Sequence, residues 1–144
     1  MNKILWGLFC ILAVISAIPA KKAAPPEHVL PFTECGEVFT SSTGEVTSPG
    51  YPGDYPNNIR DCGYLITVPE DQAIVLYFHF IDLEPGYDYI NVYDGTDDLA
   101  PSINEFTGSL GNFAIGSTGN NMYITFRSDY INVRSGFRAT WTTV

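Results

Sequence analysis

Hydrophobic residues alternate with polar ones in several short segments of residues 35–144. In one of these segments Tyr64, Ile66 and Val68 fall on the same face of an extended strand. The same period of two recurs in four further sets: Ile74, Leu76 and Phe78; Ile90 and Val92; Met122, Ile124 and Phe126; and Phe137, Ala139 and Trp141. A period of two is typical of strands with one buried face, so the pattern predicts a series of β-strands.

The alternation slips by one residue after Phe78 and continues at Ile81 and Leu83, which predicts a β-bulge near His79. Pro-Gly, Asp-Gly and Gly-Asn pairs separate the segments about every 8–12 residues, and no window has a helical period with capping residues. Many short strands within one domain length predict an all-β fold, an antiparallel β-sandwich.

The first 34 residues lack this alternation of hydrophobic and polar positions. Lys3 precedes an apolar run over 4–15 and the small residues Ala17 and Ala20, which is typical of a secretory signal peptide. We therefore expect residues 1–20 to be a cleaved signal, 21–34 to be a flexible Pro-containing leader, and 35–144 to be the folded domain. No later stretch is apolar enough to span a membrane, so the sequence predicts a secreted, extracellular protein.

The charge balance narrows the choice of partners. From Cys35 onward the chain has four arginines against fourteen acidic residues, a formal net charge of −10. Such a domain repels phosphate backbones and sulfated polyanions, which argues against nucleic-acid and heparin binding. Cationic partners and metal cations are favoured instead.

Three cysteines are present, and Cys10 leaves with the expected signal peptide. The remaining two, Cys35 and Cys62, most simply pair in an oxidising compartment, since two cysteines alone cannot form a tetrahedral cysteine zinc site. Closing a loop of this length stabilises a fold by about 3–4 kcal/mol on the chain-entropy model.

A series of short motifs follows in a fixed order along residues 35–144. They are Cys35-Gly36, Ser48-Pro-Gly-Tyr-Pro-Gly-Asp-Tyr-Pro56, Cys62-Gly-Tyr-Leu-Ile-Thr-Val68, Asp82-Leu-Glu84, Tyr87-Asp-Tyr-Ile-Asn-Val-Tyr-Asp-Gly95, Phe126-Arg-Ser-Asp129 and Gly136-Phe-Arg-Ala-Thr-Trp141. This series resembles a CUB domain, an extracellular module. The resemblance implies a jelly-roll-like sandwich of two antiparallel sheets and a Cys35–Cys62 disulfide.

The chain departs from the family at a second disulfide that many CUB domains have. Pro85-Gly86 precedes the Tyr-Asp pair, and Thr107 stands where the other cysteine would fall. Both cysteines are missing together, so we expect the loops around 84–88 and 106–108 to be less tethered.

The resemblance also implies a calcium site. Glu84, Asp88, Asp129 and Asn132 match the calcium-ligating positions of a subset of CUB domains, and Tyr55 matches a tyrosine that braces the site. Calcium prefers six to eight oxygen ligands, and extracellular modules bind it with weak to moderate affinity. Glu84 and Asp88 flank a Pro-Gly turn, but only the resemblance brings Asp129 beside them. The alternative is that these are ordinary solvated loop acids.

In the family such a site often receives a lysine from a partner protein, which suits an acidic domain. Tyr55, Tyr87 and Tyr130 flank the acidic positions and are candidates for a partner-contacting rim, with packing at the edge of the sandwich as the alternative. The leading hypothesis is a secreted binding module that recognises a protein partner with the help of calcium. The alternative hypothesis is a structural, extracellular-matrix or carbohydrate-binding protein that resembles spermadhesins.

No motif supports catalysis. The chain has only His28, in the leader, and His79, on the outer face of an expected strand, and it lacks a Gly-x-Ser-x-Gly elbow. Residues 116–119 (Gly-Ser-Thr-Gly) fit a hairpin loop better than a phosphate cradle, because no lysine or helix follows them. We therefore expect a non-enzymatic protein.

Overall fold

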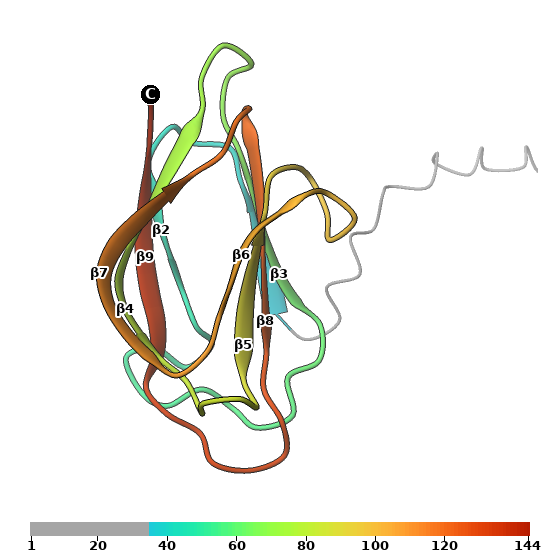
Figure 1. Cartoon of the computed structure of the whole chain (residues 1–144). Helices are drawn as coiled ribbons and strands as arrows, with labels where there is room; N and C mark the ends of the chain where they lie inside the picture. The colour runs from blue at the N-terminus through green and yellow to red at the C-terminus, as the bar shows by residue number, and fades with distance from the viewer. Residues whose placement is uncertain (1–34) are drawn as a thin grey trace, which may run out of the picture.

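The computed structural model describes residues 35–144 as a sandwich of two β-sheets (Figure 1). The five-stranded sheet has the order β1-β3-β8-β5-β6 and the four-stranded sheet the order β2-β9-β4-β7. The strands are β1 Cys35–Phe39, β2 Gly44–Thr47, β3 Cys62–Thr67, β4 Ile74–Asp82, β5 Tyr89–Tyr93, β6 Ser102–Phe106, β7 Ser109–Gly116, β8 Asn121–Arg127 and β9 Gly136–Thr143. The expected signal peptide and leader lie outside the described residues.

The alternating hydrophobic sets form the core between the two sheets. None of the residues in these sets is more than 6% exposed, and Ile66, Phe78 and Ile124 are fully buried. The predicted bulge is confirmed, because the register of β4 against β9 shifts between Phe78 and Phe80. The shift returns Ile81 to the buried face and keeps the end of β4 in register with the core.

The expected all-β sandwich of two sheets is confirmed, and two details of the expectation need correction. The sandwich is not wholly antiparallel, since β1 pairs in parallel with β3, with Cys35 opposite Cys62. The expected disulfide joins these two cysteines, so the bond links the starts of two neighbouring parallel strands. Residues 116–119 do not form a hairpin loop, because β7 and β8 lie in different sheets and the segment crosses between them. Ser117 fixes this crossing by accepting a hydrogen bond from the Ile74 backbone N–H at 2.8 Å.

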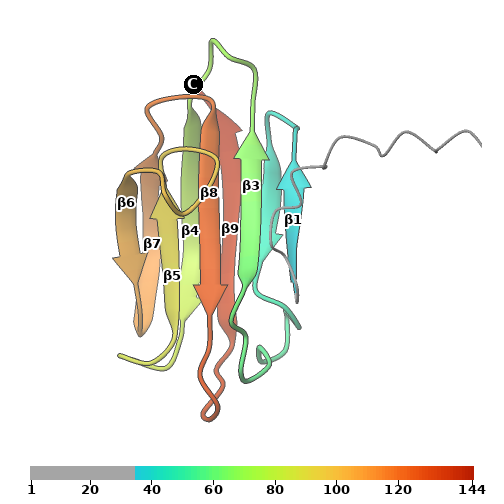
Figure 2. The same cartoon turned by 90° about the vertical axis from the view of Figure 1, so that its right-hand side faces the viewer.

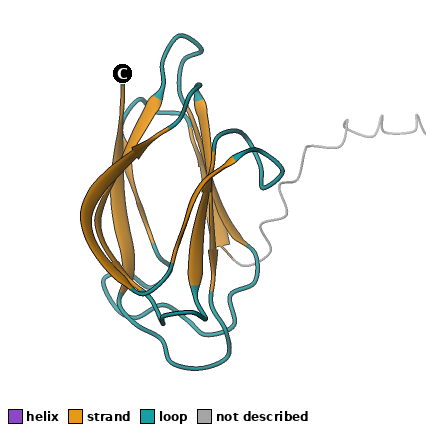
Figure 3. Cartoon of the chain, in the orientation of Figure 1, coloured by secondary structure: helices purple, strands orange, loops and turns teal. Residues whose placement is uncertain are grey.

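The loops between β2 and β3, β4 and β5, and β8 and β9 gather at one end of the sandwich, the lower end in Figures 1 and 3. Figure 2 shows the outer face of the five-stranded sheet, over which the β5–β6 loop folds toward β8. No helix among residues 35–144 has the length and hydropathy needed to cross a lipid bilayer.

Candidate metal centre

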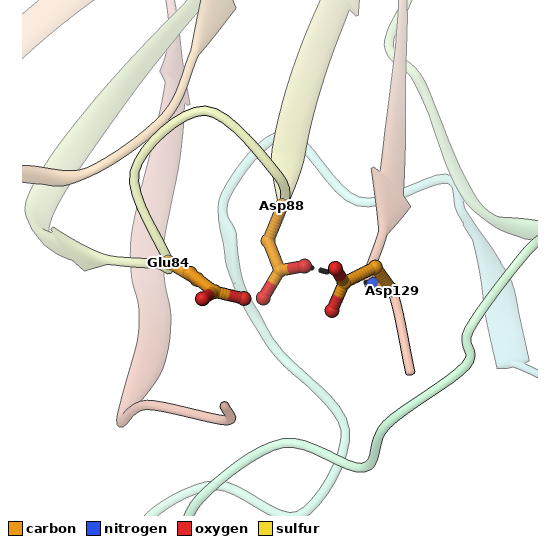
Figure 4. Close-up of side chains that lie close together, drawn as sticks. All are labelled: Glu84, Asp88 and Asp129. Carbon is orange, nitrogen blue, oxygen red and sulfur yellow. Dashed lines mark hydrogen bonds between the residues drawn. The ribbon is translucent and has the colours of Figure 1, made fainter. Parts of the chain in front are cut away.

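Three carboxylates meet at the end of the sandwich where these loops gather (Figure 4). Glu84 follows β4, Asp88 directly precedes β5, and Asp129 follows β8. Pairing of Tyr89 with Arg127 sets β5 beside β8, so the residues just beyond each strand end lie close together. The turn after Glu84 then carries the chain from the four-stranded sheet to the five-stranded one, which explains how three distant segments converge.

The carboxylate oxygens fit the size of a calcium ion. One oxygen from each of Glu84, Asp88 and Asp129 lies within 4.8 Å of the other two. Two oxygens that both ligate calcium at 2.3–2.6 Å are at most about 5 Å apart, so this spacing admits one ion between the three groups. The ion pairs of Arg134 with Asp82 and of Arg138 with Glu45 involve none of these three carboxylates. Carboxylates held this close together repel one another, and a cation between them relieves the repulsion.

Asp88 is the most firmly held of the three side chains. It is 1% exposed, and the Tyr55 hydroxyl donates to its Oδ2 at 2.5 Å while the Asp129 backbone N–H donates to its Oδ1 at 2.8 Å. Each carboxylate oxygen keeps a second lone pair that is free to ligate a cation. Burial and the hydrogen bond to Asp88 raise the pKa of Tyr55 well above its ordinary value, so Tyr55 stays a neutral donor at physiological pH.

Glu84 has one oxygen engaged and one without a partner. The Asn132 side-chain amide donates to Glu84 Oε1 at 2.7 Å, whereas Oε2 is buried and accepts no hydrogen bond. A buried carboxylate oxygen without a donor is costly unless something cationic binds it. Glu84 Oε2 is therefore an oxygen of this cluster that could accept a cation.

Asn132 presents its amide nitrogen to Glu84 in this arrangement, so a ligand role requires rotation of the amide to turn Oδ1 inward. Its backbone has φ of +63°, a left-handed conformation that asparagine tolerates better than most residues. The Asp129 backbone C=O accepts from the Asn58 N–H at 2.5 Å, and Asp129 Oδ1 accepts from the Ile131 N–H at 3.0 Å. The first bond holds the β8–β9 loop against the β2–β3 loop, and the second lies within the β8–β9 loop. The ligand role of Asn132 stays a prediction.

The loop that lacks the second disulfide is tethered by hydrogen bonds, contrary to expectation. The Thr107 hydroxyl accepts from the Gly86 N–H at 2.9 Å and donates to the Glu84 carbonyl at 3.2 Å. The Leu83 N–H also donates to the Gly108 carbonyl at 3.0 Å. Thr107, which stands in place of one cysteine, therefore holds the same loops together. The sequence analysis missed this role because sequence alone does not show which residues face Thr107.

The three tyrosines of the expected contact rim occupy different environments. Tyr55 is 1% exposed, so its expected part in a partner-contacting rim is wrong, because its ring packs edge-on against Phe126 inside the sandwich. Its hydroxyl donates to Asp88 and accepts from the Glu84 N–H at 3.1 Å, and the expected bracing of a metal site by Tyr55 stays a prediction. Tyr87 and Tyr130 are 64% and 66% exposed and remain available to a partner.

Comparison with known proteins identifies the domain. The family model of the CUB domain matches residues 35–141. The chain belongs to the CUB domain family. This CUB domain is 36% identical over 141 residues to human procollagen C-endopeptidase enhancer 2, a match that covers 95% of this chain and 33% of the enhancer. It is also 31% identical over 119 residues to human neuropilin-1, which covers 76% of this chain and 13% of neuropilin-1.

A solved structure of the MASP-1 CUB2 domain bound to Ca²⁺ is similar to this CUB domain, with 30% identity and a TM-score of 0.64. The match covers 73% of this chain and 96% of that one. The CUB1-EGF-CUB2 domains of rat MASP-1 match with 31% identity and a TM-score of 0.66, over 76% of this chain and 42% of theirs. This chain spans about a third of the length of the enhancer and a smaller share of neuropilin-1. The relatives are extracellular, and the family supports a non-enzymatic, protein-binding module.

Proposed function

We propose that this CUB domain is secreted and recognises an extracellular protein partner with the help of one calcium ion held at its acidic end. Glu84, Asp88 and Asp129 would supply the side-chain ligands. The observation that carries the proposal is their convergence within 4.8 Å, together with the unpartnered buried oxygen of Glu84. The Ca²⁺-bound CUB2 domain of MASP-1, which is similar over nearly its whole length, supports the choice of metal.

The remaining residues of the site would position the ligands. Tyr55 orients Asp88 through its hydroxyl and also accepts from the Glu84 N–H, so one buried group sets the geometry of two carboxylates. Groups that orient ligands in this way commonly change metal affinity by 10–100-fold when removed. Asn132 would complete the ligand set once its amide turns to present oxygen.

The partner that suits such a site presents a basic side chain. Three carboxylates around one divalent cation leave a single negative charge, which attracts a lysine ammonium. Tyr87 and Tyr130 stand exposed beside the site and would form the amphipathic rim of the contact. Arg60 donates a hydrogen bond to the Tyr130 hydroxyl and lies 5.8 Å from the centre of its ring, which limits the motion of this side chain.

Calcium titration of the chelator-stripped domain tests the metal site. We expect calorimetric heat that saturates near one equivalent of calcium, and we expect Asp129→Asn to abolish it. Asp71→Asn is the matched control, because it removes the same charge from an exposed loop outside the site and should bind like the wild type. Saturable binding that survives in Asp129→Asn, or no binding at millimolar calcium, would show that the acids are ordinary loop acids.

The carbohydrate-binding or matrix alternative makes a different prediction. It expects retention on a glycan column that chelator leaves unchanged, whereas calcium-assisted protein recognition expects partner binding that chelator abolishes.

A further inference from the structure

A groove of about 850 Å³ runs over the outer face of the five-stranded sheet. Its floor includes Gly63 of β3, Tyr93 of β5, and Tyr123 and Thr125 of β8. Its walls are the loop segments 58–61 and 97–99, which stand on either side of this floor. The second wall belongs to the β5–β6 loop, which Figure 2 shows folded over the face of β5 and β8. A hollow of this size is within the range of ligand sites in proteins.

The middle of the groove is electronegative. Tyr123 is 6% exposed, and burial is the main reason that its pKa is raised. Three carboxylates, Asp98 and Asp97 from one wall and Asp61 from the other, raise the pKa further by Coulomb repulsion of the tyrosinate. The negative charges of two separate loops therefore act together on the Tyr123 side chain in the floor of the groove.

The cationic residues of the groove lie toward its other end. Arg127 is four residues from Tyr123 along β8, which is about 13 Å at 3.3 Å per residue. Arg60 is engaged with Asn58 and Tyr130 beside the metal centre. Arg60 and Arg127 thus lie near the end of β8 together with Asp61, which precedes the residue paired with Phe126, whereas Asp97 and Asp98 belong to the opposite wall.

The groove is continuous with the proposed metal site. Asp129 and Tyr87 line the groove and also belong to the acidic end of the sandwich. Tyr123 and Asp129 are six residues apart, about 20 Å in extended chain. A single extended segment can therefore reach both places.

We propose that the groove binds an extended, basic segment of the protein partner, with a lysine or arginine side chain held between the wall that carries Asp61 and the wall that carries Asp97 and Asp98. This inference rests on the proposed function in treating the domain as a protein-binding module, but it does not depend on calcium. A second basic residue about six positions along the segment would reach the metal end.

Charge complementarity favours this occupant over a neutral glycan. A sugar gains from the tyrosine rings but brings no positive charge to the three carboxylates, whereas an ammonium or guanidinium group is attracted by all three. Leu99, at the tip of the wall, is 91% exposed and offers apolar contact to the backbone or side chains of the same segment.

The test uses two synthetic octapeptides of glycine and serine, one with a single central lysine and one with lysines at positions 1 and 7. Amide chemical shifts of the mature domain are followed by NMR in the presence of chelator. We expect either peptide to shift Gly63, Tyr123 and Thr125, and we expect Asp97→Asn/Asp98→Asn to weaken that binding at least fivefold. Asp61→Asn, on the opposite wall, should weaken it as well.

Glu70→Gln/Asp71→Asn is the matched control, because it removes two charges from an exposed loop that does not line the groove. Equal weakening in this control and in the groove variant would overturn the proposal, since binding would then follow net charge alone. Shifts of the groove residues by chitotriose but not by the lysine peptides would overturn it in favour of a glycan site.

The same titrations separate this proposal from the calcium proposal. With calcium present, the two-lysine peptide should bind at least tenfold more tightly than the single-lysine peptide, and Asp129→Asn should remove that difference. Groove shifts without calcium binding would refute only the metal site, and calcium binding without groove shifts would refute only the groove.

Discussion

Removal of the Tyr55 hydroxyl tests whether one buried group orders the acidic end. The hydroxyl donates to Asp88 at 2.5 Å and accepts from the Glu84 N–H at 3.1 Å, and the residue is 1% exposed. Tyr55→Phe keeps the ring in its place against Phe126 but leaves a carboxylate oxygen and a backbone N–H without their partner. Both groups lose a hydrogen bond in a site with little access to water.

The expected magnitude follows from these two lost bonds. A buried polar group that loses its partner costs about 1–3 kcal/mol, and a bond to a charged acceptor lies toward the upper part of that range. We therefore expect Tyr55→Phe to lower the free energy of unfolding in chelator by about 2–4 kcal/mol. Because Asp88 and Glu84 lose the group that orients them, calcium affinity should fall by about 10–100-fold.

Urea denaturation in chelator measures the first effect, and calorimetric titration of calcium measures the second. Tyr77→Phe is the matched control, since it removes a hydroxyl from a tyrosine on β4 that is 37% exposed and lies outside the site. An unchanged denaturant slope would show that the mutant unfolds from the same compact state. If Tyr55→Phe matched Tyr77→Phe in both stability and calcium affinity, Tyr55 would not brace the site and the reasoning would be refuted.

Three further predictions concern the framework that carries the site. Replacement of Cys35 and Cys62 by serine should lower the free energy of unfolding by about 3–4 kcal/mol, because the bond closes a long loop, and urea denaturation checks this value. Gly136→Ala should lower the melting temperature strongly, because Gly136 has φ of +86° and an added Cβ would overlap the Ser48 hydroxyl. Burial raises the pKa of Tyr64 above its ordinary value of 10.0, so the folded state prefers the neutral phenol and the stability that this provides is lost as pH rises above about 10. Tyr64→Phe should therefore lose less stability than the wild type between pH 9 and 11, as measured by denaturation at each pH.

The core and its strands could be predicted because their information is local. A period of two, as in the segment from Met122 to Phe126, predicts which side chains face inward. The slip of the same kind of period in β4 predicts the position of its bulge. The direction of β1 could not be predicted in this way, since five residues with mixed exposure carry no signal of their partner strand. Its parallel pairing depends on the route of the chain between β1 and β3.

The candidate site shows the same division between local and non-local information. Glu84 and Asp88 are near each other in sequence, but Asp129 joins them only because β5 pairs with β8. Tyr55 was placed on a surface rim because tyrosine is amphipathic, and its burial depends on Gly136 and Phe126 from distant strands. The tethering role of Thr107 could not be predicted. A hydroxyl can replace a disulfide as a tether only where backbone groups face it, and the sequence does not show which groups face Thr107.

The order of charges along β8 connects the metal centre with the groove. Asp129 beyond the strand end is acidic, Arg127 at the end of the strand is basic, and Tyr123 further along lies in the field of Asp61, Asp97 and Asp98. The two acidic regions are about 20 Å apart, which is twice the screening length of about 10 Å at 0.1 M salt, so each acts on a bound cation almost independently. A partner with one basic residue gains from one region only. A segment with two basic residues at the matching spacing gains from both, because binding at the first raises the effective concentration at the second. If both proposals hold, the arrangement would select partners by the spacing of their charges and not by their net charge, which a uniformly acidic surface could not do.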